Sequence, residues 1–340
     1  MNCNVLEMSV EMVADSSISE QRLWKDYNDI NSVLSHEFLC IPPYRCVNGR
    51  FINEIKASLP DKKRAAGIVC RAIHSPFQRA YQMEYRYKHC KIFDKYMEAI
   101  EYANLAAYDG NYICSYITMV PIIEALLREW IGEDPTASFN RIRESIKNID
   151  DKLKTIIFFD DDRHTITDAY IGYMNDVVRD KFYVSFDEYY NLGLASVFNR
   201  NLTLHRFEGA DSYEEAIANT DRIMLVLDVI AELYLMQDMK KYWNITFYAT
   251  PDANADFQLH KELYYKHEWL SLGYNDSSLL YSYTHHPDPE KTREITTILK
   301  NQIKILDFME KCKRNEVDSS ALLELLKADR KADKASGTEH

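Results

Sequence analysis

Residues 213–238, YEEAIANTDRIMLVLDVIAELYLMQD, predict a helix that is apolar almost all round. Its apolar side chains extend from Ile217 to Leu235, and a helix with no polar face belongs in a protein core. Ser212 and Glu215 have the spacing of a capping box, which predicts where the helix begins.

A second run of this kind occupies residues 111–131, where Pro121 is expected to kink the helix or to mark its first turn. Glu124 is its lone acid before Glu129, and a pair with Arg128, four positions on, is one interpretation of it. Two buried helices are typical of a compact helical bundle. Only 9 Gly and 9 Pro among 340 residues favour the same fold class.

The chain is therefore predicted to be mostly α, a helical bundle with helical N- and C-terminal extensions. We expect a helical region at 1–90, the bundle at 91–240, a mixed or helical region at 241–330 and a disordered tail at 331–340. Further helices are predicted at 19–37, 86–108, 137–157, 163–181, 184–198, 290–313 and 318–329. A loop is expected at 40–49, a strand at 243–250 and irregular structure at 251–290.

The formal charge of −12 argues against a general nucleic-acid coat protein, because binding phosphates needs local cation density. The seven cysteines are scattered, and neither a basic leader nor a membrane-length apolar run occurs. We therefore expect a soluble cytoplasmic protein with no membrane partner.

Positive charge is concentrated between Asp61 and Lys91, which hold eight Lys or Arg and two acids. Aromatic residues are interleaved with these cations, a combination that binds single-stranded RNA. The candidate RNA contacts are Arg71, Arg79, Tyr81 and Arg86. The alternative is a solvated amphipathic helix that pairs with an acidic face elsewhere.

Signals for other chemistry are weak. The glycine-rich phosphate and dinucleotide motifs and the serine-hydrolase motif are missing from the sequence, and we expect neither a metal nor a cofactor. The acidic stretch at 160–164 is interpreted as a solvated turn. His36 lies near Cys40 and Cys46 but lacks the spacing of a zinc site. His74, His260 and His267 are interpreted as structural or exposed.

Residues 198–205, Phe-Asn-Arg-Asn-Leu-Thr-Leu-His, form a short polar break between the predicted buried helices. Arg200, Asn201 and His205 are its candidate catalytic residues. A guanidinium clamps phosphate oxygens and an imidazole titrates near neutrality, so together they can cleave RNA without a metal. In the structural alternative, Arg200 caps the preceding helix and His205 is a satisfied core residue.

This stretch resembles the HEPN superfamily, whose signature is an arginine, then Asn, Asp or His, and a histidine four to six positions after the arginine. The resemblance covers roughly residues 90–240 and includes the upstream acid Glu124. Many relatives have glycine after the histidine, where this chain has Arg206. Arg206 and Glu124 are further candidates for substrate binding.

The resemblance implies a metal-independent endoribonuclease acting at a homodimer interface. It also implies a role in antiphage defence or as a toxin, with a possible regulatory partner or antitoxin. The alternative function is a non-catalytic helical module that binds RNA or protein.

Overall fold

The computed structural model describes residues 20–44, 47, 49–132, 143–144, 146–147, 149, 161–238, 242 and 251–271. Helices dominate these residues and none of them lies in a strand, so the mostly α prediction is confirmed. The predictions for 243–250, 290–313, 318–329 and 331–340, and most of that for 137–157, lie outside the described residues.

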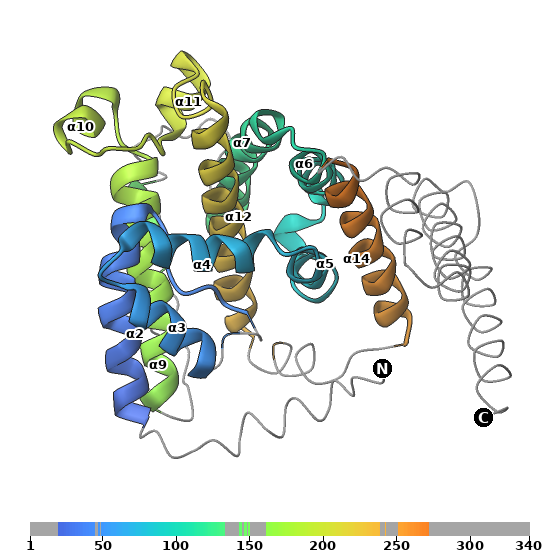
Figure 1. Ribbon diagram of the computed structural model, residues 1–340, viewed down its shortest axis with the longest axis horizontal. Helices are drawn as coiled ribbons and strands as arrows, with labels where there is room; N and C mark the ends of the chain where they lie inside the picture. The colour runs from blue at the N-terminus through green and yellow to red at the C-terminus, as the bar shows by residue number, and fades with distance from the viewer. Residues whose placement is uncertain are drawn as a thin grey trace, which may run out of the picture.

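Helices α7 (Tyr112–Ile131) and α12 (Tyr213–Met236) pack along each other at the centre of the fold (Figure 1). The Ser212 hydroxyl accepts the Glu215 N–H at 3.2 Å, which confirms the predicted start of α12. Pro121 lies inside α7 rather than in its first turn. Both core helices therefore follow from hydrophobic periodicity.

Five helices precede α7 in the described part of the chain. They are α2 (Glu20–Leu34), α3 (Gly49–Ser58), α4 (Lys62–His74), α5 (Pro76–Tyr85) and α6 (Met97–Tyr108). Helix α6 packs against α7, and α4 packs against α12. The predicted helix at 86–108 is wrong in its first part, where two 3₁₀ turns occupy Tyr87–His89 and Lys91–Phe93. Tyr87 and Phe93 stack in the core at 4.6 Å between ring centroids, and these tight turns bring the two rings together.

Two helical segments lead toward the polar motif. Helix α9 (Asp161–Tyr173) continues into a π-helix (Met174–Phe182), close to the predicted 163–181. The acidic stretch predicted as a turn is helical from Asp161 onward. Helix α10 (Phe186–Asn191) is shorter than the predicted 184–198, because a Ser185–Glu188 capping box starts it and Gly193 adopts a positive φ just after it.

Helix α14 (Pro251–Ser271) contradicts the prediction of irregular structure at 251–290 for its first 21 residues. It packs against α5 and α6 (Figure 1). Phe257, Leu263 and Tyr264 are buried in this contact, which favours a helix over a loop. None of the described helices combines the length and apolar character that a bilayer crossing demands.

Candidate functional site

The predicted polar break is a short helix, α11 (Arg200–Arg206), with Asn199 as its N-cap. The Asn199 Oδ1 accepts the Leu202 N–H at 3.0 Å. Its Nδ2 donates to the carbonyl oxygens of Lys181 and Val184 at 2.9 and 3.1 Å. Because Asn199 is fully buried, these bonds fix where α11 begins and therefore position Arg200.

The turn after α11 is held by α12. Phe207 ends the helix in the left-handed region, with φ of 62°. Gly209 also has a positive φ, and a Cβ there would lie 2.6 Å from the Val197 carbonyl oxygen, so only glycine fits. The Asn219 Nδ2 donates to the carbonyl oxygens of Val197 and Gly209, both at 2.7 Å. The chain thus turns after His205 without a glycine at position 206.

Arg200 is held by two neighbours. Its Nη2 lies 2.7 Å from the Glu124 Oε2, and its Nη1 donates to the Asn201 Oδ1 at 2.8 Å. Glu124 also pairs with Arg128 at 2.8 Å, which confirms that predicted pair. Helix α10 ends at Asn191, so Arg200 does not cap it.

Tyr183 is a buried neighbour of this ion pair that the sequence analysis missed. Burial and the charge of Glu124 raise the pKa of the Tyr183 phenol well above its ordinary value, and the Arg200 charge opposes them only partly. The phenol therefore stays neutral. Because the Tyr183 hydroxyl group is uncharged, the negative charge of Glu124 is balanced by the guanidinium groups of Arg200 and Arg128.

His205 is exposed, so it is not a core residue. Its ring forms a T-shaped pair with the Phe186 ring, with 6.2 Å between the centroids, and the neighbouring Arg206 guanidinium lies 4.8 Å from the centroid of the Phe186 ring. Five residues of α-helix separate two side chains by about 140° and about 7.5 Å. A single copy of α11 therefore presents Arg200 and His205 on different sides.

Three of the predicted RNA contacts lie in the core. Arg79 is 1% exposed and forms an ion pair with Asp228 of α12. Arg86 pairs with Glu232 of the same helix at 3.1 Å and lies over the ring of Tyr81, which is also buried. Buried cations that already have carboxylate partners are poorly placed to bind phosphates. The alternative interpretation of this segment was a solvated helix that pairs with an acidic face elsewhere. The acidic partners are present, on α12, but the ion pairs are buried and not solvated.

The isolated histidines have structural partners. His74 lies 3.2 Å from Asp221, and His267 lies 2.6 Å from Asp109. His260 is held between Glu84 and Glu101 at 2.7 and 3.3 Å. Within the described part of the chain, no group of three or more His, Cys, Asp or Glu side chains could hold a metal ion. Cys46 lies outside that part.

Comparisons of the chain with protein-family models, with curated proteins and with solved structures find no match. Function must therefore be inferred from α11 and its neighbours. That region combines a guanidinium in a fixed orientation, a carboxamide bonded to it and an exposed imidazole within seven helical residues.

Proposed function

We propose that the protein is a metal-independent endoribonuclease of HEPN type, with Arg200, Asn201 and His205 as its catalytic residues. One observation carries the proposal. Glu124 and Asn201 orient the Arg200 guanidinium on the same short helix that exposes His205. Such preorganisation suits a group that stabilises charge developing in a transition state.

In the proposed reaction, His205 removes the proton from a ribose 2′-OH, and the 2′-oxygen attacks the adjacent phosphorus. Arg200 stabilises the negative charge that develops on the phosphate oxygens. The bond from phosphorus to the 5′-oxygen breaks, and that oxygen receives a proton from an imidazolium. The products are a 2′,3′-cyclic phosphate and a 5′-OH. Arg206, exposed beside His205, is placed to contact the flanking strand.

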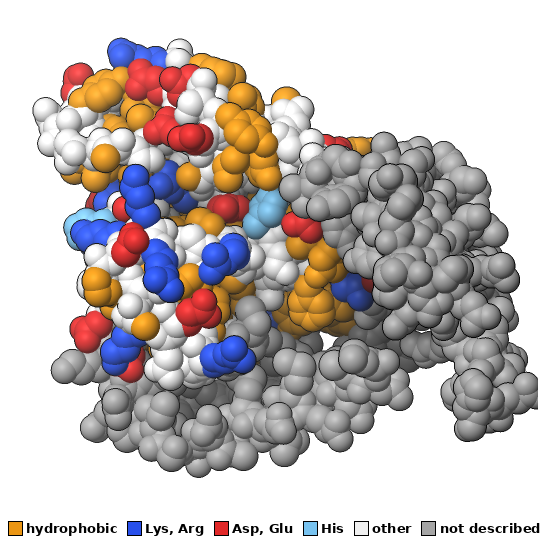
Figure 2. Space-filling view, viewed as in Figure 1, with side chains coloured by type: hydrophobic (Ala, Val, Ile, Leu, Met, Phe, Trp, Pro, Cys, Tyr) orange, Lys and Arg blue, Asp and Glu red, His pale blue; other side chains and the backbone are white. Residues whose placement is uncertain are grey.

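An exposed apolar surface around α11 supports the proposed homodimer. Seven large hydrophobic side chains are exposed in the described part of the chain, and five of them belong to α10, α11 or the segments beside them: Tyr190, Leu192, Leu204, Phe207 and Tyr213. Figure 2 shows hydrophobic side chains gathered at this end of the molecule. Apolar side chains grouped at a surface commonly mark an interface. In the proposed dimer, a second copy seated there brings His205 of one chain toward Arg200 of the other.

The same surface favours a second candidate function, a non-catalytic module that binds a protein partner through α10 and α11. The proposed role in defence or as a toxin includes an antitoxin or other regulator, and such a partner would bind at this surface. The two functions differ in one observable, because only the first yields cut RNA.

The test is RNA cleavage by purified protein in EDTA, with wild type compared with His205→Ala and Arg200→Ala. Both variants should lose at least about 100-fold in rate while staying folded and dimeric. Arg64→Ala, an exposed arginine on α4, should cleave like wild type. Cleavage by His205→Ala at the wild-type rate would refute the assignment. Growth of cells producing wild type or His205→Ala tests toxicity separately.

A further inference from the structure

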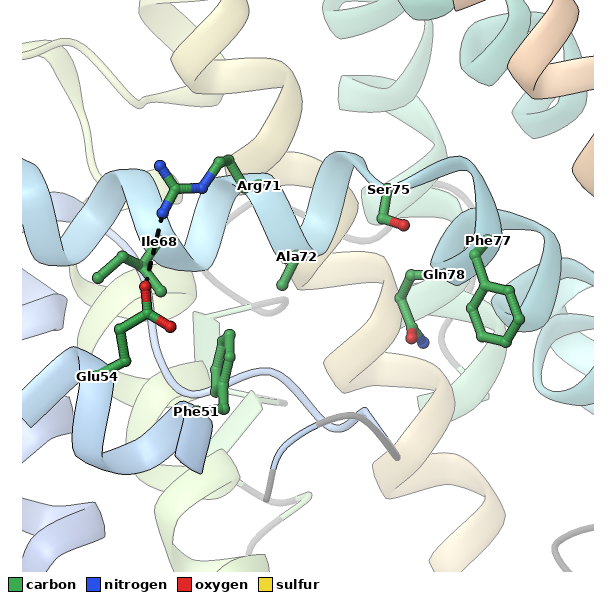
Figure 3. Close-up of a pocket in the computed structure, with 8 residues that line it drawn as sticks. All are labelled: Phe51, Glu54, Ile68, Arg71, Ala72, Ser75, Phe77 and Gln78. Atoms are coloured by element: carbon green, nitrogen blue, oxygen red, sulfur yellow. Dashed lines mark ion pairs between the residues drawn. The ribbon is translucent and has the colours of Figure 1, made fainter. Parts of the chain in front are cut away.

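A pocket of about 480 Å³ lies where α3, α4 and the start of α5 meet. Figure 3 shows its eight lining residues: Phe51, Glu54, Ile68, Arg71, Ala72, Ser75, Phe77 and Gln78. Its volume falls within the range of about 300–1,000 Å³ that is usual for small-ligand sites. It lies outside α11 and its neighbours.

The pocket has a charged end and an aromatic end. Figure 3 shows Arg71 and Glu54 together at one end, Phe77 at the other, and Phe51 below Ala72 between them. The Arg71–Glu54 pair is long, at 4.0 Å, and its side chains are 74% and 55% exposed. Exposed pairs of this kind contribute little. Arg71 can therefore exchange Glu54 for an incoming anion at small cost.

Two further features favour an anion. The Ser75 hydroxyl faces the pocket and does not cap α5, although Ser75 is the N-cap residue. The start of a helix carries partial positive charge, which adds to that of Arg71.

Phe77 is 48% exposed, so its ring is accessible from the pocket. Its ring meets Phe257 of α14 edge-on at 5.2 Å between centroids, and that contact holds it at the pocket end. A partly exposed aromatic ring in the same pocket as an arginine offers a base a stacking surface and its phosphate a cation.

We propose that this pocket binds one unstacked nucleotide of single-stranded RNA, with a phosphate on Arg71 and the base against Phe77 or Phe51. The inference rests on the proposed function, in which RNA is the substrate. Of the predicted RNA contacts, Arg71 is kept. The proposed aromatic contacts are Phe51 and Phe77, in place of the buried Arg79, Tyr81 and Arg86.

The experiment measures binding of a short, fluorescently labelled single-stranded RNA by anisotropy, in full-length protein carrying His205→Ala so that the RNA stays intact. Adding Arg71→Ala or Phe77→Ala should raise the Kd about tenfold. The matched controls are Arg64→Ala, which removes the same charge from α4, and Tyr102→Ala, which removes an aromatic ring of α6 that is 63% exposed. Both controls should change the Kd less than about twofold.

Equal weakening by Arg64→Ala and Arg71→Ala would overturn the pocket in favour of general electrostatic attraction. Competition by free AMP or UMP forms a second arm. If Arg71→Ala weakens the binding of free nucleotide but leaves the binding of RNA unchanged, the assignment of the pocket to RNA is overturned. RNA binding that needs Arg71, in a wild-type protein that never cleaves, would support the pocket and refute the nuclease. If wild type cleaves RNA but Arg71→Ala and Phe77→Ala bind RNA with an unchanged Kd, the nuclease is supported and the pocket is refuted.

Discussion

Glu124 and Arg200 form an ion pair that joins the buried helix α7 to the first turn of α11, with 2.7 Å between Oε2 and Nη2. Their side chains are 16% and 21% exposed, so the pair is mostly shielded from water. Arg128 holds the other carboxylate oxygen of Glu124. The orientation of the proposed catalytic arginine is therefore set by the core helix, and α11 alone does not determine it.

The first prediction concerns Glu124→Gln. The amide keeps the shape of the side chain but removes the charge that orients Arg200. Cleavage should fall about 10- to 100-fold, because a small misplacement of a catalytic group has effects of that size. RNA binding in EDTA should change little. The measurement is kcat and KM on a labelled RNA.

Glu129→Gln is the matched control for Glu124→Gln. Glu129 is on the same helix and pairs with the exposed Lys95 at 3.1 Å, away from α11. This variant should cleave like wild type. An equal loss of activity in both variants would mean that the effect arises from α7 as a whole and not from the orientation of Arg200.

The second prediction concerns Asn199→Ala, which removes the cap of α11 and the two bonds to the carbonyl oxygens of Lys181 and Val184. The free energy of unfolding should fall by about 1–3 kcal/mol, the combined range for a lost cap and for buried acceptors left without donors. Urea denaturation measures it. Asn191→Ala, at the exposed end of α10, should change it by less than about 0.5 kcal/mol.

The third prediction separates a core role for Arg79 from an RNA-binding role. Arg79→Ala leaves Asp228 buried without its cation, which should cost about 3–5 kcal/mol of stability. The exposed Arg64→Ala should cost less than about 0.5 kcal/mol. Thermal and urea unfolding measure both variants. An Arg79→Ala protein as stable as wild type, but with weaker RNA binding, would restore the surface interpretation of this residue.

Local periodicity was enough to predict α7 and α12, because both helices are apolar on nearly every side. It could not show that Arg79 is buried, since its partner Asp228 lies 149 positions away. From the sequence alone, a basic residue is predicted to lie at the surface, because the carboxylate that would pair with it in the core is brought close only by the fold. Arg86 is likewise buried against a carboxylate distant in the sequence, Glu232 of α12, and its guanidinium lies over the ring of Tyr81.

The motif itself was predicted from the sequence, but its backbone was not. Seven residues are too few for helical periodicity, and α11 depends on bonds from Asn199 and from Asn219 of α12. The N-cap preference of asparagine was the one local signal for this helix. Helix α14 was missed because several polar residues interrupt its apolar face. One of them, His260, finds its partners Glu84 and Glu101 on α5 and α6, far away in the sequence.

The last prediction concerns the attachment of α14 at acid pH. Glu84 of α5 accepts from His260 of α14 at 2.7 Å and from Lys88 at 2.9 Å, and Lys88 also reaches Asp256 of α14. Burial alone would raise the pKa of Glu84, but the bonds and charges of His260 and Lys88 outweigh it and lower that pKa. A carboxyl whose pKa is lower in the folded state stabilises the fold fully above its unfolded pKa, about 4.3 for Glu. That stabilisation is lost as the pH falls through the folded value.

Hydrogen exchange along α14 tests this dependence. Between about pH 5 and pH 3, amide protection around His260 should fall before protection in α12 does, because α14 depends on the ionised Glu84 and α12 does not. Glu268 gives an internal contrast, since burial raises its pKa and its protonation at acid pH therefore favours the folded state. Peptides around Glu268 should hold their protection to lower pH than peptides around His260. The Glu84→Gln variant cannot lose a charge at this position, so its α14 should exchange faster at pH 6 and vary less with pH. If wild type and Glu84→Gln showed the same pH profile, another group would control the attachment.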